Sequence, residues 1–493
     1  MTIAIRADAS AATGIGHVKR CLALAEAAAA FGERTLFVCA GTLPPALAEE
    51  VRRACELRYL RPGADDAAAF LAALPSGRVD CVVVDHYQLD ARWHDAVAGA
   101  LRCRIAAVDD LADRSLHVDL LVDHNLSPDH RAKYRGRIGP RTRLLGGPRF
   151  ALISPRYAGL APRTPADEVS TIGVSLGGSD PAGLTSLVVE ACRDVAGFAG
   201  PIEVVTTSAN PRLDELGRLA NERPGVTLSV DLPDLTAFHQ RHDLYVGAAG
   251  GSSWERCCLG APTLLLQVAG NQRVVIDGLR AAGAASALPD GSPVTCGTVG
   301  AAIGALIRDP ARRRELSEAA RALVDGRGAV RVAAALLAPG LTVRPATLDD
   351  RRLMFEWRNH PETRRLSRDS AALDWANHCA WVGRVLADPQ RLLLVGRLGA
   401  VDVGVIRFDR LDGDRLEVSL YLDPVLQGTG LGGALLDAGE GAALRWAGPG
   451  TVIEAHVLWD NEKSGRMFER AGYVHADGVW TRRPVFPPTL ERS

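Results

Sequence analysis

Through the first 157 residues, short apolar runs rich in valine and isoleucine alternate with longer runs rich in alanine and leucine. This alternation constrains the fold more than any other feature, because it predicts strands that are each followed by a helix. Each short run is apolar along nearly its whole length, which is typical of a parallel sheet covered by helices on both faces. The predicted strands are 3–5, 35–39, 81–84, 105–108 and 120–122.

Polar residues directly follow three of these strands. The carboxyl ends of parallel strands meet at one edge of an open α/β sheet, where ligands bind, so these residues predict a single crevice. Each aspartate taken singly is also explained as a helix cap or a loop residue. The residues are Asp85-His86-Tyr87, Asp109-Asp110 and Asp123-His124-Asn125.

The turn between the first strand and the first helix reads Thr13-Gly14-Ile15-Gly16-His17. A helix start presents unpaired N–H groups and the positive end of its dipole, which suits a phosphate and disfavours an imidazolium. His17 is therefore a candidate general base, with Asp8 as a candidate partner that orients it. The alternative is a glycine turn with a surface or capping histidine, because short glycine motifs are weak evidence alone.

A second α/β unit is predicted at 169–337, after a proline-containing linker at 158–168. Its first strand runs into Gly177-Gly178-Ser179-Asp180-Pro181, where Asp180 would cap a helix and Pro181 would be its first residue. A later turn, Gly250-Gly251-Ser252-Ser253-Trp254-Glu255, opens an apolar helix. Ser252 and Glu255 match a capping box, so Glu255 either holds its own helix start or contacts a ligand. Two such halves facing each other suit a nucleoside diphosphate.

The composition narrows the classes of function. A chain of 493 residues is long enough for about three domains. Its net charge of −1 gives no overall electrostatic basis for binding nucleic acid or an anionic membrane. Its ten cysteines include no Cys-x-x-Cys pair, which indicates a reducing compartment and no metal site, and no apolar run is long enough to span a membrane. We therefore expect a cytoplasmic protein without metal; the sequence leaves its oligomeric state unknown.

A third domain is predicted at 341–485, after Ala338-Pro339-Gly340. Its strand 416–422 runs into Gln427-Gly428-Thr429-Gly430-Leu431-Gly432 and then an apolar helix, an arrangement whose backbone can cradle a phosphate. The turn fails as a dinucleotide-binding fingerprint, because its glycine spacing is wrong and no repeated βαβ pattern follows.

The motifs of the first two units, taken in order, resemble those of the UDP-sugar hydrolases of pseudaminic acid biosynthesis over about residues 1–337. That family resembles the GT-B glycosyltransferases in fold. The resemblance implies hydrolysis of UDP-2,4-diacetamido-2,4,6-trideoxy-altrose with release of UDP, and it implies His17 as the catalytic base. The motifs are Arg6-Ala7-Asp8, Gly14-Ile15-Gly16-His17, Asp85-His86-Tyr87, Asp109-Asp110, Asp123-His124-Asn125, Ser175-Leu176-Gly177-Gly178 and Gly250-Gly251-Ser252-x-x-Glu255 with Asn271-Gln272. The expected UDP-sugar contacts are Gly14, Gly16, Tyr87, Gly177, Gly178, Gly251, Ser252, Ser253, Glu255, Asn271 and Gln272.

The carboxy-terminal turn is similar to the acetyl-CoA motif of the GNAT acetyltransferases, and the strand 451–458 and the run 468–473 match the rest of that pattern. The resemblance implies acetyl-CoA as co-substrate. The run 357–359 also resembles the acetyltransferase of the same pathway, which acetylates the 4-amino group of a UDP-linked sugar. The implied acetyl-CoA contacts are Leu422, Gln427, Gly428, Gly430, Gly432, Asn461, Ser464 and Phe468, and the implied amino-sugar contacts are Trp357, Arg358, Asn359 and His378.

Acetyl transfer needs a neutral amine and a proton for the leaving thiolate. Glu417, Glu454 and His456 on the two central strands are candidate bases, although strand carboxylates also serve in ion pairs. Many GNAT enzymes place a tyrosine where Phe468 stands here. The proton therefore comes from Tyr473 or water, or the thiolate leaves without a dedicated acid.

The sequence thus predicts an α/β protein with two Rossmann-like halves in a GT-B arrangement, followed by a mixed α/β GNAT domain. The predicted function is bifunctional: acetylation of a UDP-linked 4-amino sugar, and hydrolysis of the product to release UDP. One alternative is a GT-B glycosyltransferase with a sugar acceptor, fused to the same domain. Another is a GNAT domain that senses acetyl-CoA without catalysis.

Overall fold

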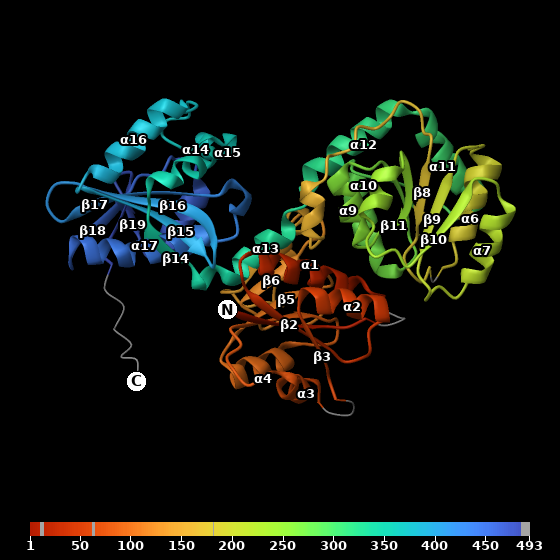
Figure 1. Ribbon diagram of the computed structural model, residues 1–493, viewed down its shortest axis with the longest axis horizontal. Helices are drawn as coiled ribbons and strands as arrows, with labels where there is room; N and C mark the ends of the chain where they lie inside the picture. Colours follow the sequence, from red (N-terminus) through yellow and green to blue (C-terminus); the bar gives the residue numbers. More distant parts are fainter. Residues whose placement is uncertain (10–13, 62–64, 181, 485–493) are drawn as a thin grey trace. The chain divides into compact units, whose positions relative to one another are not determined.

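The structure is a computed structural model that describes residues 1–9, 14–61, 65–180 and 182–484, without the side chain of Asn271 (Figure 1). Its internal contacts divide the chain into two compact units. Unit 1 comprises residues 1–29 and 33–332, and unit 2 comprises residues 30–32 and 333–493. The division falls within helix α13 (Gly328–Leu337).

Unit 1 contains two separate sheets, and the first has the order β3-β2-β1-β4-β5-β6-β7 with every neighbouring pair parallel. The central strands are buried along their length, as β4 illustrates, because helices cover both faces. The strands are β1 (Thr2–Ala7), β2 (Arg34–Cys39), β3 (Glu56–Tyr59), β4 (Cys81–Asp85), β5 (Arg104–Val108), β6 (Leu120–Asp123) and β7 (Arg143–Gly146). The helices are α1 (Gly16–Ala30), α2 (Pro45–Ala54), α3 (Asp66–Ala73), α4 (Ala91–Leu101) and α5 (His130–Lys133), with short 3-10 turns η1 (Pro148–Phe150) and η2 (Pro155–Gly159).

All five strands predicted for this region are present, whereas β3 and β7 were not predicted. These two strands lie at the edges of the sheet and are less buried than the central ones. Edge strands carry polar residues because neighbouring elements cover them only in part. The continuous apolar run that identifies a buried strand is therefore missing from the sequences of β3 and β7.

The second sheet of unit 1 is also parallel, with the order β10-β9-β8-β11-β12-β13. No helix or strand lies between residues 160 and 171, which lead into it. Its strands are β8 (Ile172–Ser175), β9 (Ile202–Thr206), β10 (Val226–Val230), β11 (Leu244–Ala248), β12 (Thr263–Leu266) and β13 (Ser286–Ala287). The helices are α6 (Thr185–Glu190) with a π turn η3 (Ala191–Val195), α7 (Leu213–Glu222), α8 (Thr236–Arg241), α9 (Ser252–Leu259), η4 (Gly270–Gln272), α10 (Arg273–Ala281), α11 (Cys296–Arg308), α12 (Pro310–Leu323) and α13.

The helix after β8 does not begin where the sequence predicts it. Helix α6 begins at Thr185, and Pro181 lies outside the described residues. The Asp180 carboxylate accepts hydrogen bonds from the backbone N–H of Leu184 at 3.1 Å and of Thr185 at 2.9 Å. Asp180 thus satisfies helix-start donors as a cap does, but from a loop with positive φ and not from the residue before the helix.

Unit 2 is built on a mixed sheet with the order β14-β15-β16-β17-β18-β20-β19, in which β17 and β18 are the parallel pair. Together with the two parallel sheets, it confirms the predicted α/β fold class. The strands are β14 (Thr342–Pro345), β15 (Arg391–Leu398), β16 (Val401–Arg410), β17 (Arg415–Leu422), β18 (Val452–Ala455), β19 (Val474–Ala476) and β20 (Val479–Arg482). The helices are η5 (Ala338–Gly340), η6 (Leu348–Asp350), α14 (Arg351–Asn359), α15 (Pro361–Arg365), α16 (Trp375–Ala387), η7 (Pro424–Leu426), α17 (Leu431–Ala447) and α18 (Glu462–Arg470).

The two faces of the unit 2 sheet carry different helices. Alternate residues of β16 point to opposite faces. Ile406 and Phe408 contact α17 at Gly439, whereas Arg407 lies 5.5 Å from the ring of Trp381 in α16. The helix after the glycine turn therefore covers one face, and α16 covers the other.

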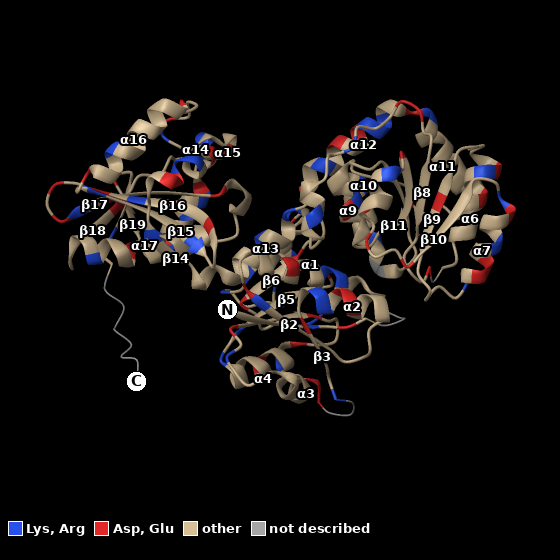
Figure 2. Ribbon diagram, in the orientation of Figure 1, with Lys and Arg blue, Asp and Glu red and all other residues tan. Residues whose placement is uncertain are grey.

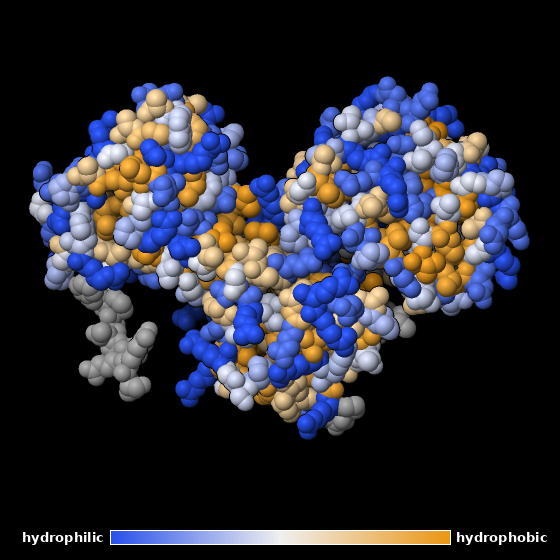
Figure 3. All heavy atoms as spheres, in the orientation of Figure 1, coloured by the Kyte–Doolittle hydropathy of each residue, from blue (hydrophilic) through white to orange (hydrophobic). Residues whose placement is uncertain are grey.

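The described residues include no helix with the length and apolar character needed to cross a bilayer. Figure 3 shows hydrophilic and hydrophobic residues interspersed on the visible face of each unit. Acidic and basic residues are likewise mixed along the ribbon of both units in Figure 2, in agreement with the net charge of −1.

Candidate functional site

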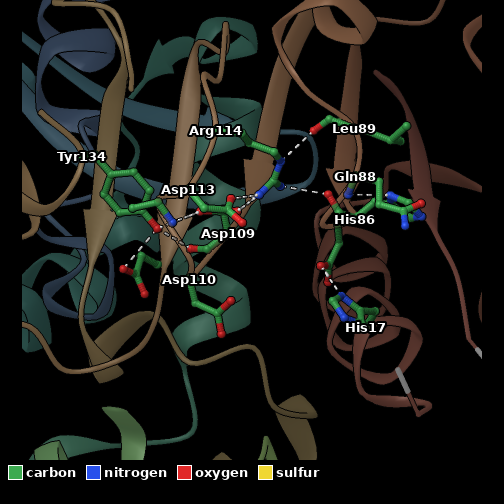
Figure 4. Close-up of polar contacts among 12 residues, drawn as sticks. His17, His86, Gln88, Leu89, Asp109, Asp110, Asp113, Arg114 and Tyr134 are labelled. Carbon is green, nitrogen blue, oxygen red and sulfur yellow. Dashed lines mark hydrogen bonds and ion pairs between the residues drawn. The ribbon is translucent and has the colours of Figure 1, made fainter. Parts of the chain in front are cut away.

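The first turn of α1 places His17 against the end of β4. His17 is buried, and its Nδ1 lies 2.6 Å from Asp85 Oδ1 (Figure 4). A carboxylate only accepts hydrogen bonds, so Nδ1 carries the proton and Nε2 is the atom that can accept one. Burial opposes ionisation of Asp85, but the charge of Arg20 and the hydrogen bonds from Arg20 and His17 outweigh it and hold the pKa of Asp85 well below its usual range. The result is a histidine oriented by a permanently charged carboxylate.

The prediction that Asp8 orients His17 is wrong. Asp8 Oδ1 lies 2.5 Å from Arg6 Nη1, and it accepts a hydrogen bond from the backbone N–H of Ala40 at 2.7 Å. Arg6 is only 1% exposed, and a buried guanidinium needs carboxylate partners, which Asp8 and Asp66 supply. Asp8 is therefore used to neutralise Arg6.

Tyr87 and Asp110 lie beside this histidine. The Tyr87 ring is perpendicular to the His17 ring at a centroid distance of 4.7 Å. Burial and then the charge of Asp110 raise the pKa of Tyr87 above its usual range, so its hydroxyl stays protonated at neutral pH. Asp110 Oδ2 accepts a hydrogen bond from Asn125 Nδ2 at 3.1 Å, whereas its buried Oδ1 has no hydrogen-bond partner among the described residues.

Each of the other two aspartates at this sheet edge is paired with a cationic side chain. Asp109 pairs with Arg114 at 2.7 Å and accepts a hydrogen bond from the Tyr134 hydroxyl at 3.1 Å (Figure 4). Asp123 pairs with Lys133 at 2.6 Å. The predicted cluster is thus present, but the two committed aspartates hold loops in place and Asp110 keeps an available oxygen.

His124 follows Asp123 and is 5% exposed, with no hydrogen-bond partner for Nδ1 in the described part of the chain. Its ring lies 6.2 Å from that of Trp254 in α9, a helix that follows β11 of the second sheet of unit 1. Burial, with the nearby charge of Arg20, lowers the pKa of His124 to about 4, so this imidazole is neutral at pH 7. A second contact joins the same halves, because Lys19 Nζ donates a hydrogen bond to Pro233 O at 3.2 Å.

The glycines predicted to contact UDP differ in backbone conformation and in the space around them. Gly14 has φ +70° and Gly177 has φ +92°, values that favour glycine. Gly16 and Gly251 have open space where a Cβ would lie. A Cβ on Gly178 would approach the Thr207 side chain to 2.9 Å, and the Gly178 carbonyl accepts a hydrogen bond from the Thr207 hydroxyl at 2.9 Å.

The start of α9 is organised by an arginine that the sequence interpretation missed. Arg256 is 2% exposed, and its Nη2 donates hydrogen bonds to Ala248 O at 2.8 Å and Ser253 Oγ at 3.2 Å. Its Nη1 donates to Ser252 Oγ at 3.1 Å, so both serines face the guanidinium. A Cβ on Gly247 would lie 2.8 Å from Arg256 Cζ. The glycine in an otherwise apolar strand was the sequence signal for this close approach.

Glu255 does not form the predicted capping box. Helix α9 begins at Ser252 itself, and the residue before it, Gly251, makes no side-chain cap. Glu255 Oε2 instead lies 3.7 Å from His239 Nδ1, whose partner at 3.0 Å is the Tyr157 hydroxyl. Burial raises the pKa of Glu255 to about 7.

Gln272 holds its own loop, because its Oε1 accepts a hydrogen bond from the backbone N–H of Val268 at 3.0 Å. The neighbouring candidate, Asn271, lies in η4, and its side chain is outside the described residues. The structure therefore assigns a loop contact to one member of this predicted pair.

In unit 2, β17 ends at Leu422 and leads through η7 and Gln427 into the glycine turn. Gly428 and Gly430 have φ of +77° and +78°, and Gly430 directly precedes α17. A Cβ on Gly432 would lie 2.9 Å from Met467 Sδ of α18. The turn thus needs glycine for its backbone conformation and for close packing beneath the helix start, where N–H groups suit a phosphate.

Two of the three candidate bases lie where the parallel strands β17 and β18 separate. Glu417 and Glu454 are the last register partners of β17 and β18, although β17 continues to Leu422. Glu417 Oε1 pairs with Arg368 Nη2 at 2.6 Å, and the buried Glu454 pairs with Arg415. His456, the third candidate, is exposed beyond the end of β18.

The carboxy-terminal candidates divide into helix-capping and buried side chains. Asn461 caps α18, because its Oδ1 accepts a hydrogen bond from the Ser464 N–H at 3.2 Å. Phe468 is buried 5.0 Å from the ring of Tyr473. The Tyr473 hydroxyl donates to Glu440 Oε1 at 2.7 Å, and burial and that carboxylate raise the pKa of Tyr473 well above its usual range. The hydroxyl is committed to α17, which leaves the predicted thiolate acid without support.

All four predicted amino-sugar contacts have partners within the fold, Arg358 through a hydrogen bond from Nη2 to Asp369 O at 2.9 Å. His378 Nε2 donates to Arg351 O at 3.0 Å, and Asn359 binds both the N–H and the carbonyl of Leu373. Trp357 packs against the core beneath α14 and α16. Arg358 is the member with an unpaired polar atom, because its buried Nη1 has no acceptor within the described ranges.

No group of three histidine, cysteine, aspartate or glutamate side chains among the described residues could hold a metal ion.

The protein matches known proteins in two separate regions. Residues 340–474 match the model of the acetyltransferase (GNAT) domain. Over 340 residues, the chain is 25% identical to the spore coat polysaccharide biosynthesis protein SpsG of Bacillus subtilis (strain 168), a match that covers 68% of this chain and 98% of SpsG.

Solved structures are similar to the same regions. The glycotransferase of kitacinnamycin is 18% identical, with a TM-score of 0.47 over 67% of this chain and 97% of its own. The acetyltransferase yncA of Salmonella typhimurium, solved with acetyl-CoA, is 22% identical, with a TM-score of 0.25 over 30% of this chain and 96% of its own. The chain thus joins a region similar to a polysaccharide biosynthesis protein to a region that matches the GNAT acetyltransferase domain.

Proposed function

We propose that the protein is a bifunctional nucleotide-sugar enzyme. The GNAT domain transfers an acetyl group from acetyl-CoA to the amine of a UDP-linked amino sugar, and unit 1 hydrolyses the acetylated product to release UDP. The observation that carries the hydrolase assignment is the contact between His17 and Asp85 at the start of α1. The sugar expected from the sequence is the 2,4-diacetamido-2,4,6-trideoxy-altrose of pseudaminic acid biosynthesis.

In the hydrolysis step, Asp85 holds the proton on His17 Nδ1 and Nε2 takes a proton from water. The water oxygen bonds to the anomeric carbon while the bond from that carbon to the UDP oxygen breaks. The bonding pair leaves with UDP, whose charge is stabilised by N–H groups at helix starts. Tyr87 remains protonated beside His17 and supplies a hydrogen-bond donor.

In the acetylation step, the free amine attacks the thioester carbonyl, the carbon–sulfur bond breaks and the coenzyme A thiolate leaves. Glu417 or Glu454 accepts the amine proton at the point where β17 and β18 separate. Because Tyr473 is committed to Glu440, solvent water supplies the proton to the thiolate.

The hydrolase assignment is tested by incubating the full chain with the UDP-linked diacetamido sugar in the absence of any other sugar. We expect UDP release with water as acceptor, and a loss of about 10²–10⁴-fold in His17→Ala. His117→Ala is the matched control, because His117 pairs with Asp95 on the surface. UDP release that requires an added sugar acceptor would instead identify a glycosyltransferase, and full activity in His17→Ala would remove this histidine from the mechanism.

The acetyltransferase assignment is tested by thiol release from acetyl-CoA in the presence of the UDP-linked 4-amino sugar. We expect turnover, which Glu417→Gln or Glu454→Gln lowers, with exposed Glu469→Gln as the control. The absence of thiol release at saturating acetyl-CoA would favour a domain that only senses acetyl-CoA.

A further inference from the structure

A tyrosine, a histidine and a glutamate from three segments of unit 1 meet in one cluster. Tyr157 lies in η2, His239 in α8 and Glu255 in α9, and both η2 and α8 pack against α9. The Tyr157 hydroxyl lies 3.0 Å from His239 Nδ1 and is hydrogen-bonded to the Glu255 carboxylate. His239 Nδ1 lies 3.7 Å from Glu255 Oε2. One carboxylate is therefore contacted by two side chains from other segments of the chain.

The three side chains differ in exposure. Tyr157 is 2% exposed and His239 is fully buried, whereas 23% of the Glu255 side chain is exposed. Glu255 also lies in the first turn of α9, directly after the glycine turn that the sequence predicts as part of the UDP site. Of the three, the glutamate is thus the residue that can touch a ligand, and the other two act through it.

The hydrogen bonds of this cluster have one direction while Glu255 is charged. A carboxylate only accepts hydrogen bonds, so Tyr157 donates its single hydroxyl hydrogen to Glu255. The Tyr157 oxygen then accepts a hydrogen bond from His239, which carries its proton on Nδ1. Burial and the charges of Arg256 and His242 lower the pKa of His239, so the imidazole stays neutral. His239 Nε2 is buried without a partner in the described part of the chain, so no contact there favours the other tautomer.

The hydrogen bond from Tyr157 favours the charged form of Glu255. Burial raises the pKa of Glu255 to about 7. The charges of Arg256 in α9 and Lys19 in α1 oppose this effect, and the charge of Asp234 adds to it. Tyr157 is the one of these groups that also donates a hydrogen bond, so it fixes where the carboxylate points as well as its charge.

We propose that Tyr157 and His239 are positioning residues for nucleotide binding by unit 1, which hold Glu255 as an oriented carboxylate that accepts hydrogen bonds from the ribose hydroxyls. This inference rests on the proposed release of UDP by unit 1. Tyr157 belongs to the segment that joins the two parallel sheets, and Ser154 in the same segment donates a hydrogen bond to Glu26 of α1 at 3.1 Å. The nucleotide site in one half of unit 1 is thus supported by a segment that also contacts the other half.

The pH dependence of UDP affinity, measured by calorimetry on the full chain, tests these roles. Glu255→Gln gives the pH dependence that comes from UDP itself. In Tyr157→Phe we expect the midpoint of the remaining pH dependence to rise from about 7 by about one pH unit, because the charged carboxylate loses a hydrogen bond. UDP binding should weaken severalfold near pH 7 and recover at higher pH. In a Glu255→Gln background, Tyr157→Phe should add no pH dependence. A loss of affinity that is equal at every pH would overturn the proposal, because it would indicate a purely structural role.

Two variants of His239 separate its hydrogen bond from its bulk. Asparagine can place its side-chain NH2 group near the position of Nδ1, so His239→Asn should keep the original midpoint, whereas His239→Leu should raise it. Tyr245→Phe is the matched control, because the Tyr245 hydroxyl is also buried in this region but donates to the backbone carbonyl of His239 at 2.6 Å. We expect its midpoint to be unchanged. Equal midpoints in His239→Asn and His239→Leu would refute the role of His239.

UDP binding and hydrolysis of the UDP-linked sugar are measured separately, so this proposal and the proposed function can fail independently. An unchanged midpoint in Tyr157→Phe together with normal hydrolysis would refute the positioning roles and leave the hydrolase assignment standing. A raised midpoint without hydrolysis by the unchanged protein would refute the hydrolase assignment and leave the positioning roles standing. The absence of UDP binding by the unchanged protein would refute both.

Discussion

Single side chains at the edge of the first sheet have different tasks although the sequence presents them alike. Asp85, Asp109 and Asp123 are each neutralised by a cation and nearly inaccessible. Asp110 differs, because Asn125 holds one of its oxygens and the other has no hydrogen-bond partner among the described residues. An uncommitted carboxylate oxygen near His17 and Tyr87 is suited to accept a hydrogen bond from a sugar O–H or N–H.

Asp110→Asn tests this role and also removes the charge that acts on Tyr87. The amide oxygen of the new side chain can keep the hydrogen bond from Asn125, so the free position changes from an acceptor to a donor. We expect the KM of UDP-sugar hydrolysis to rise about tenfold or more, because the amide N–H of the new asparagine would then face the O–H or N–H donor of the sugar. Asp113→Asn, at an exposed position, controls for the lost charge and should keep the original KM. Equal KM values in the two variants would exclude Asp110 from substrate recognition.

Glu255 gives unit 1 a pH dependence at neutrality. Burial raises the pKa of Glu255 to about 7, so the group is mostly neutral at pH 6 and mostly charged at pH 8. If the carboxylate accepts hydrogen bonds from the ribose hydroxyls of UDP, affinity should rise with pH across this range and level off above it. Calorimetric titration of UDP from pH 6 to pH 8 measures this change. Glutamine does not titrate in this range, so the pH dependence that remains in Glu255→Gln comes from UDP itself. The same pH dependence of UDP affinity in the variant and in the unchanged protein would contradict the assignment.

At the scale of elements, β11 and α9 are joined by a buried guanidinium. Arg256 holds the last carbonyl of β11 and two hydroxyls at the start of α9, and Gly247 gives it the space to do so. The geometry of this strand–turn–helix element therefore depends on a residue outside the glycine motif.

Gly247→Ala should destabilise this part of the protein strongly. The added Cβ would lie 2.8 Å from Arg256 Cζ, and displacing the guanidinium would leave a buried cation and a buried carbonyl unpaired. We expect a loss of about 3 kcal/mol in the unfolding transition of unit 1. Gly217→Ala in α7 is the contrasting control, because its Cβ meets open space and alanine favours a helix by about 0.5–1 kcal/mol. Denaturant unfolding of both variants gives the two values, and an unchanged stability of Gly247→Ala would contradict the packing argument.

At the scale of the whole molecule, one chain carries two proposed chemistries in sequence. In the proposed reaction sequence, unit 2 makes the acetylated sugar nucleotide and unit 1 consumes it. Tethering two sites raises the local concentration of the shared intermediate when the bulk concentration is low. This advantage requires both activities on the same chain, whatever the arrangement of the two units.

Mixing single-defect chains tests this advantage. One chain carries His17→Ala and the other Gly430→Val, which places a β-branched residue at φ +78° in the acetyl-CoA turn. At enzyme and substrate concentrations far below KM, the mixture should show a longer lag before UDP release than the same amount of each active site on unmodified chains. Identical lags would show that the intermediate equilibrates with the solution before hydrolysis.

The sequence by itself determined the elements that depend on short-range pattern. The apolar strands, the helices that follow them and the glycine turns at residues 14–16 and 427–432 come from periodicity and backbone preference over a few residues. Only the tertiary structure decided which polar groups meet. Asp85 rather than Asp8 reached His17 because burying Arg6 consumed Asp8, Arg256 became the organiser of α9 because β11 offered a glycine, and Tyr473 was bound by Glu440 of α17. The pairings of His17 with Asp85 and of Tyr473 with Glu440 join residues 68 and 33 positions apart. Desolvation in the folded core selects among partners that the local sequence presents as equivalent.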